Sequence, residues 1–225
     1  SGFSADRPYA RTFRATAWHK ADMPVLHQFN LSFQYEPAGD WLFAITLSGA
    51  RGRDLTSGVF MKNSIPFEAA LAGRTTQRDR PFPQINGAIY YSGSFGSSNY
   101  HAVNFKVEKR YSTGLTFLAN YTISKNIENM GFITNFDQFA TVIMLDSYHP
   151  EREKSVSPLD IPQVFVLSYI YDLPWGPGRP WLTSGKWGNI LGGWQVSGIT
   201  SIRGGFPGEV RTNLNPPVYG AWNPP

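Results

Sequence analysis

The chain has 225 residues, and its 16% of charged residues is low against the roughly one quarter of a water-soluble domain, which favours a surface partly covered by lipid. The scattered Lys and Arg, with a net charge of +4, give no nucleic-acid footprint, and the absence of cysteine excludes disulfides and thiolate metal sites. No apolar run approaches the roughly 18 residues of a membrane-spanning helix, so helical insertion is excluded.

The first strand pattern follows a polar, aperiodic segment, residues 1–22, that we interpret as loop. From Val25 to Tyr35 the odd positions are mostly apolar, whereas Gln, Asn and Ser occupy even positions. Residues 36–40 have the composition of a tight turn, and the alternation resumes at Trp41. These two segments are predicted to form a hairpin.

A long polar loop is predicted over residues 51–83, because its charged side chains follow no period. Two strand-like segments come next, at 84–91 and 100–110, and a Gly/Ser run at 92–98 separates them. We interpret the two segments as one traverse of the sheet that is broken at this run.

The clearest alternation lies between residues 115 and 124 and follows a short turn at 111–114. Leu, Phe, Ala, Tyr and Ile occupy one side of this strand, and Thr, Asn and Ser dominate the other. A second long loop is then predicted over residues 125–162.

The last third of the chain contains an alternating strand from Phe165 to Tyr171 and a Pro- and Gly-rich connection at 174–188. A further strand begins at Trp194, and the chain beyond Arg203 is again rich in Gly and Pro. Both of these punctuating residue types predict irregular structure.

Short connections therefore alternate with long ones, as in outer-membrane barrels with short periplasmic turns and long external loops. We predict an all-β fold, an antiparallel transmembrane β-barrel of which this chain is a part. The residues predicted to face the lumen are Asn30, Ser32, Gln34, Thr46, Asn104, Lys106, Glu108, Thr116, Asn120 and Thr122. Those predicted to face lipid are Phe29, Leu31, Phe33, Phe43, Ile45, Leu47, Val103, Phe105, Val107, Leu115, Phe117, Tyr121, Phe165, Leu167 and Tyr169.

Several short motifs carry a family resemblance: His27–Gln34, Ser98–Ala102, Lys106–Leu115, Asn120–Lys125, Asp160–Pro162, Phe165–Tyr169, Leu173–Gly176 and Leu191–Gly198. In their order and spacing they resemble the barrel of TonB-dependent outer-membrane transporters, in particular the Oar-like branch. The resemblance implies uptake of an extracellular nutrient across the outer membrane of a Gram-negative bacterium. The partners implied are TonB with ExbB and ExbD, which supply the energy.

The sequence shows no plug domain, no TonB box and no terminal aromatic strand. Since barrels of such transporters have about 22 strands, residues 1–225 are predicted to be a partial barrel domain that lacks the plug and the barrel C-terminus. We do not expect this piece to transport by itself. A siderophore, cobalamin, an oligosaccharide and a peptide all stay open as substrates.

A loop cluster carries groups that could bind a ligand: Asp146, Tyr148, His149, Glu151, Arg152 and Glu153. A divalent metal is disfavoured because there is no second His and no helical spacing, so we expect a solvated loop. If the loop binds anything, we expect the nutrient, or a lipopolysaccharide phosphate paired with Arg152.

The tryptophans Trp41, Trp175, Trp181, Trp187 and Trp194 are predicted to be interfacial aromatics at the level of the lipid headgroups, with carbohydrate stacking as the alternative. No Ser/His/acid set or Gly-x-Ser-x-Gly motif is present, so no catalytic residue, enzyme activity or cofactor is expected. A secreted or surface-exposed all-β binding module is the alternative to a transporter. In such a module a second sheet would cover the apolar sides of the strands.

Overall fold

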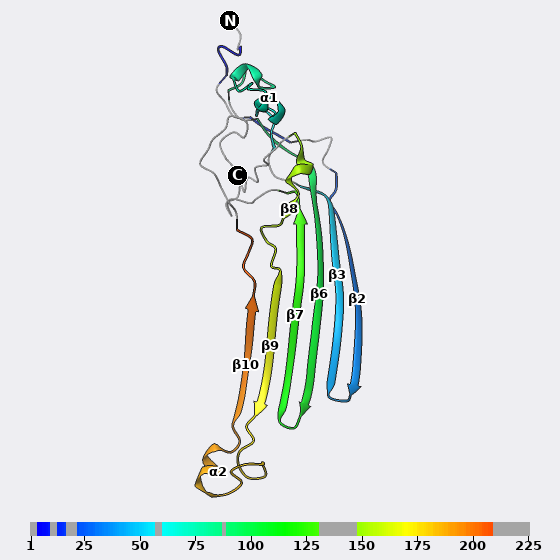
Figure 1. The fold of residues 1–225 in the computed structure, drawn as a ribbon, viewed down its shortest axis with the longest axis vertical. Coiled ribbons are helices and arrows are strands. Elements are labelled where there is room, and N and C mark those ends of the chain that lie inside the picture. Colours follow the sequence, from blue (N-terminus) through cyan, green and yellow to red (C-terminus); the bar gives the residue numbers. More distant parts are fainter. Residues whose placement is uncertain are drawn as a thin grey trace.

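The main feature of the computed structural model is a seven-stranded antiparallel sheet, here called the wall (Figure 1). The structure describes residues 4–9, 13–16, 22–56, 60–86, 89–130 and 148–208. The strands of the wall, in chain order, are β2 (Val25–Ala38), β3 (Trp41–Thr56), β6 (Ser94–Ser112), β7 (Leu115–Glu128), β8 (Ser155–Val156), β9 (Gln163–Asp172) and β10 (Gln195–Arg203). Their spatial order is β10-β9-β7-β6-β3-β2, with β8 beside β7. The sheet is not closed, because β2 and β10 are its two edges.

Two-residue turns connect the long strands at one end of the wall, here called the turn end. In the β6–β7 turn both Thr113 (φ 51°) and Gly114 (φ 80°) have positive φ. Two successive residues of this kind match the right-handed twist of antiparallel strands. The connection between β9 and β10 reaches the same end and carries the helix α2 (Gly185–Leu191) (Figure 1).

The opposite end, here called the loop end, carries a small folded unit. It includes β1 (Phe13–Thr16), β4 (Phe60–Met61), α1 (Phe67–Leu71), the 3₁₀ helix η2 (Gln77–Asp79), β5 (Ile89–Ser92) and the 3₁₀ helix η3 (Pro150–Glu153). The three short strands form a separate sheet in the order β1-β5-β4, with β1 parallel to β5. We call residues 60–86 and 148–153 the cap.

Several boundaries differ from those predicted from the sequence. The segment 1–22 contains β1, because it pairs with β5, a partner that its own composition does not reveal. β3 continues to Thr56, past the predicted start of a loop at 51. The rest of the predicted loop contains the helices α1 and η2. The Gly/Ser run at 92–98 does not interrupt a strand, since β6 begins at Ser94 and runs unbroken. The predicted strand at 84–91 is replaced by β5, which belongs to the smaller sheet.

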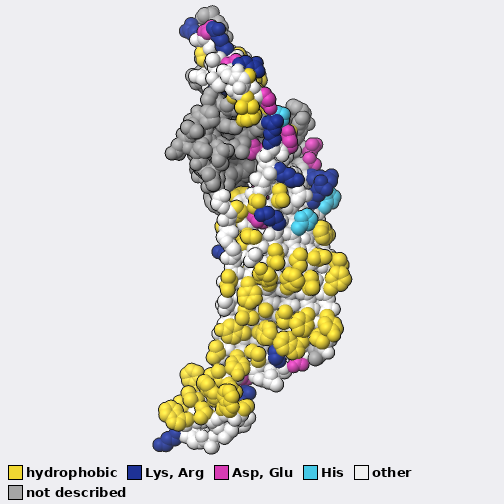
Figure 2. Space-filling view, in the orientation of Figure 1, with side chains coloured by type: hydrophobic (Ala, Val, Ile, Leu, Met, Phe, Trp, Pro, Cys, Tyr) yellow, Lys and Arg dark blue, Asp and Glu magenta, His cyan; other side chains and the backbone are white. Residues whose placement is uncertain are grey.

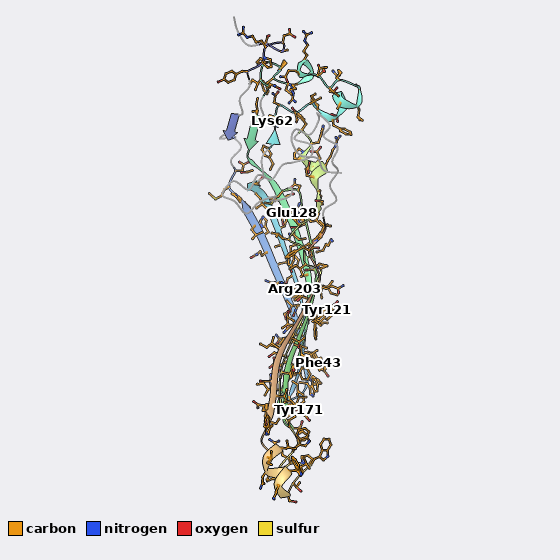
Figure 3. All side chains as sticks on the ribbon, turned by 90° about the vertical axis from the view of Figure 1, so that its left-hand side faces the viewer. Phe43, Lys62, Tyr121, Glu128, Tyr171 and Arg203 are labelled. Atoms are coloured by element: carbon orange, nitrogen blue, oxygen red, sulfur yellow. The ribbon has the colours of Figure 1, made fainter. Side chains whose placement is uncertain are left out.

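The wall is a single layer, with side chains projecting from both of its sides (Figure 3). Large apolar side chains are exposed on it, among them Phe29 (56%) and Phe33 (62%). Within the described residues no second sheet covers this side, in contrast to a sandwich. None of the helices in the described ranges is long and apolar enough to cross a membrane.

Candidate functional site: the two faces of the wall

One face of the wall is apolar across its strands, and we call it the apolar face. Residues directly opposite each other on neighbouring strands share a face. Phe33 lies opposite Ile45, Ile45 opposite Phe105, Phe105 opposite Tyr121 and Tyr121 opposite Phe165. The register places all the residues predicted to face lipid on this one side. Their side chains form a broad hydrophobic band across the strands (Figure 2).

An aromatic cluster lies in this band near the turn end of the wall. The ring of Trp41 stacks on Phe43, with centroids 5.9 Å apart, and meets Phe117 edge to face at 5.7 Å. The ammonium of Lys109 lies 5.6 Å from the Trp41 ring and donates to the Ser112 side chain. Lys109 is 8% exposed, so this cation on the apolar face is covered and paired.

The other predicted interfacial tryptophans lie on the β9–β10 connection, also at the turn end (Figure 1). Trp175 and Trp181 form a β-bridge, and the Trp194 Nε1–H donates to the Ile190 carbonyl. Trp187 is 68% exposed. The tryptophans named from the sequence therefore all gather toward one end of the strands.

The opposite face, here called the polar face, carries the residues predicted to face the lumen. Ser32 and Thr46 share a 3.0 Å hydrogen bond across β2 and β3. Farther along the sheet the Asn104 amide donates to Thr122 at 2.9 Å. The pairing puts Gln34, Lys106 and Asn120 on one row of this face and Asn30, Glu108 and Thr116 on other rows of the same face. Lys106 and Glu108 form a 2.8 Å salt bridge along β6.

The polar face becomes apolar at β9, which the sequence reasoning missed. Val164 lies opposite Thr122, Val166 opposite Asn120 and Ile170 opposite Thr116. β9 is apolar at both odd and even positions, so a period of two could not show that its even residues lie on the polar face. Only the pairing of β9 with β7 assigns these side chains.

Residues 2–223 match the family model for an outer membrane beta-barrel domain. This chain belongs to that family. Its location is therefore the outer membrane of Gram-negative bacteria, and its open sheet is part of a barrel. Among solved structures, the outer membrane transporter YddB from Escherichia coli is similar with 9% sequence identity and a TM-score of 0.38. The match covers 70% of this chain and 20% of the transporter. No curated protein matches the chain.

The described residues of the loop cluster contact residues 62–68 of the cap. Asp146 lies outside the described residues. The Tyr148 hydroxyl is 2.8 Å from the Lys62 carbonyl oxygen and 2.9 Å from that of Ser64. Glu153 is 8% exposed, so it is not a freely solvated side chain.

The charged members of the cluster converge on Glu68 of α1. Arg152 lies 3.5 Å from the Glu68 carboxylate and His149 lies 3.7 Å from it, while the other ring nitrogen of His149 is 3.0 Å from Glu151. A hydrogen bond from its own backbone N–H, with His149 and Arg152 nearby, lowers the pKa of Glu68. The pKa of Glu151 is lowered mainly by its own backbone N–H and then by His149.

Within the described ranges no group of three His, Cys, Asp or Glu is arranged to hold a metal. Arg152 pairs with Glu68 in the structure, and its suggested binding of a lipopolysaccharide phosphate stays a prediction. These contacts tie 148–153 to α1.

Proposed function

We propose that this chain supplies barrel strands and external loops to a TonB-dependent transporter that takes up a nutrient across the outer membrane. TonB, ExbB and ExbD act through a plug domain outside these residues. The proposal is supported above all by the continuous apolar face, which gives long strands a side suited to hydrocarbon. The motifs shared with TonB-dependent transporters supply the more specific part of the assignment.

The two faces have different partners in this proposal. The apolar face meets lipid, where a polar side chain without a hydrogen-bond partner would cost several kcal/mol. The polar face lines the lumen, where its amides, hydroxyls and the Lys106–Glu108 pair contact water, the plug or the nutrient. The cross-strand bond from Asn104 to Thr122 stiffens this lining without using apolar contacts.

The two ends of the strands also differ. Two-residue connections at 39–40 and 113–114 are typical of the periplasmic side of barrels, and long folded loops are typical of the outside. We therefore assign the turn end to the periplasm and the cap to the cell exterior. The cap is then the first part of this chain that a nutrient meets.

A growth experiment tests the transport assignment. A strain lacking the full-length protein, and the same strain complemented with it, are grown on a ferric siderophore, cobalamin, an oligosaccharide or a peptide as the limiting nutrient. We expect growth on one of these to require both the protein and TonB. Equal growth in cells without TonB would overturn the energy-dependent mechanism, because a passive channel does not need that machinery.

A further inference from the structure

The apolar face changes character abruptly toward the loop end of the wall. On β2 the apolar residue Phe29 is followed outward by His27, and on β3 the apolar run gives way to Arg51 and Arg53. Lys, Arg and His side chains gather directly above the hydrophobic band, over the upper parts of the strands (Figure 2). The same change on β6 and β7 brings His101 and Lys125 to this face. We call His27, Arg51, Arg53, His101 and Lys125 the basic row.

The pairing of the strands brings the basic row together. His27 lies directly opposite Arg51, and His101 lies directly opposite Lys125. Neighbouring strands are about 4.8 Å apart, so side chains on adjacent strands reach a common ligand. Gly49 lies opposite His101, and the Phe29 ring occupies the space that a side chain at Gly49 would take. The ring of Phe29 thus lies next to that of His101, with centroids 6.4 Å apart, where the hydrophobic band meets the basic row.

The positive charge of the row is available to a partner. Arg51 and Arg53 are exposed, and neither forms an ion pair with a carboxylate of the described residues. Lys125 lies 3.3 Å from the buried Asp160, yet half of its side chain is exposed. The exposed acid nearest to Arg51 and Arg53 in sequence is Asp54, and it forms no salt bridge with either arginine.

The turn end of the same face shows the opposite arrangement. There Lys109 is covered by Trp41 and lies 3.7 Å from Asp40. Arg110 pairs with Glu36 at 2.9 Å. Cations are thus neutralised by the chain itself at the turn end of the band, whereas Arg51 and Arg53 at the loop end form no ion pair within the described residues.

We propose that the basic row binds the phosphate groups of lipopolysaccharide in the outer leaflet. The inference rests on the proposed orientation, in which the loop end faces the cell exterior and the apolar face meets lipid. An anionic lipid that packs its acyl chains on the band places its phosphates at the height of the row, and the planar guanidinium groups of Arg suit phosphate oxygens. A soluble anionic nutrient in the lumen does not reach these residues, because they lie on the side away from the polar face.

The decisive variant is Arg51→Gln/Arg53→Gln in the full-length protein. Both side chains are exposed and make no ion pair with the described residues, so folding is expected to be unaffected. The control is Arg74→Gln/Arg203→Gln, which removes the same charge from two exposed positions, one in the cap and one on the polar face of β10. Purified rough-type lipopolysaccharide is the probe, and its Kd for the detergent-purified protein is the readout.

Each basic side chain near an anionic lipid surface contributes roughly fivefold in affinity, so we expect the double variant to bind about 25-fold more weakly and the control to stay within about twofold of wild type. Unchanged binding by the double variant would overturn the proposal, and so would an equal loss in the control.

A second measurement uses the wild-type protein alone and therefore does not depend on how a variant folds. Lipopolysaccharide stripped of its phosphates is expected to bind as weakly as intact lipopolysaccharide binds to the double variant. Equally tight binding of the stripped glycolipid, or of phosphatidylglycerol, would overturn the assignment to lipopolysaccharide phosphate. Neither binding assay measures transport. If growth proves not to require TonB, the transport proposal fails, but the binding assays still decide whether the basic row binds lipopolysaccharide.

Discussion

In the wall, large apolar side chains are exposed, as in Phe33 at 62%, whereas in the cap the apolar side chain of Ile65 is buried, at 1% exposed. The wall is one layer thick in the described structure and leaves its apolar face to its surroundings. The cap buries its own apolar and polar groups, as a small water-soluble unit does. The stability of the wall therefore depends on a solvent that accepts apolar surface, and that of the cap depends on contacts within the chain.

The largest expected effect distinguishes the two faces of the wall. Ile45→Arg puts a charge in the middle of the apolar stretch of β3, where Arg costs about 2 to 4 kcal/mol in a lipid-facing barrel position. Thr46→Arg, one residue later, places the same charge on the polar face and removes only an exposed hydrogen bond to Ser32. Unfolding of the full-length protein in lipid vesicles measures the difference. Equal losses would contradict the proposed contact of the apolar face with lipid.

The same contrast explains what the sequence could predict. Alternation is a local signal, so the strands around Val25–Tyr35 and 115–124 and the division of their side chains between two faces were readable from the sequence alone. The family match confirms the β-barrel fold and the outer-membrane location. In β9 the signal failed, because Val166 and Leu167 are both apolar although they point to opposite faces.

The cap was predicted only as loop because its contacts join distant segments. The Asn63 side chain donates to Ile85, and Tyr148 reaches the carbonyls of Lys62 and Ser64. β1 pairs with β5 in parallel across a large sequence separation. No repeating pattern of residue types encodes such contacts. The meeting of Arg152 with Glu68 was equally invisible, since each residue alone resembles a solvated charge.

The next largest effect is expected in the cap. Asn63 is 1% exposed, donates to the Ile85 carbonyl at 2.7 Å and accepts from the Phe82 N–H at 3.0 Å. Asn63→Ala leaves the Phe82 N–H without its side-chain partner, whereas the Ile85 carbonyl keeps a hydrogen bond from Gln77 at 2.9 Å, so we expect a loss of about 1 to 3 kcal/mol from one unsatisfied group. Hydrogen exchange of cap amides measures the local stability. The exposed Asn86→Ala is the control, and protection in the wall should not change.

If exchange in the wall accelerates as much as exchange in the cap, the two regions unfold together and the separation drawn here is wrong. If neither region responds, the Asn63 amide does not hold the cap.

A smaller effect concerns the turn between β6 and β7. Thr113 has φ 51°, a conformation that β-branched residues adopt poorly and Asn adopts well. Thr113→Asn should raise the free energy of unfolding by about 0.5 to 1 kcal/mol. Gly114→Ala should lower it by about 1 kcal/mol, because an added Cβ has room beside Asp172 at 3.4 Å and the strain comes from φ 80° alone. Urea unfolding in lipid vesicles gives both values, and shifts of the same sign would contradict the turn geometry.

The smallest effect is a pH dependence confined to the cap. The pKa of Glu68 is lowered from its ordinary value of 4.5 by its own backbone N–H and by His149 and Arg152. A carboxyl whose folded pKa is lowered contributes stability above its unfolded pKa and loses it as the pH falls through the folded value. The tie between α1 and residues 148–153 should therefore be intact at neutral pH and weaken below about pH 4.5.

Hydrogen exchange of residues 148–153, corrected for the intrinsic pH dependence of exchange, measures this weakening. Glu68→Gln should show reduced protection already at neutral pH and little further change on acidification. Glu36→Gln, which removes a paired carboxylate at the turn end, is the matched control and should leave the cap unchanged, because its partner Arg110 lies on β6 close to the β6–β7 turn. If Glu68→Gln loses cap protection with the same pH profile as wild type, another carboxyl is responsible for the titration. Glu151 is then the first candidate, because its pKa is lowered as well.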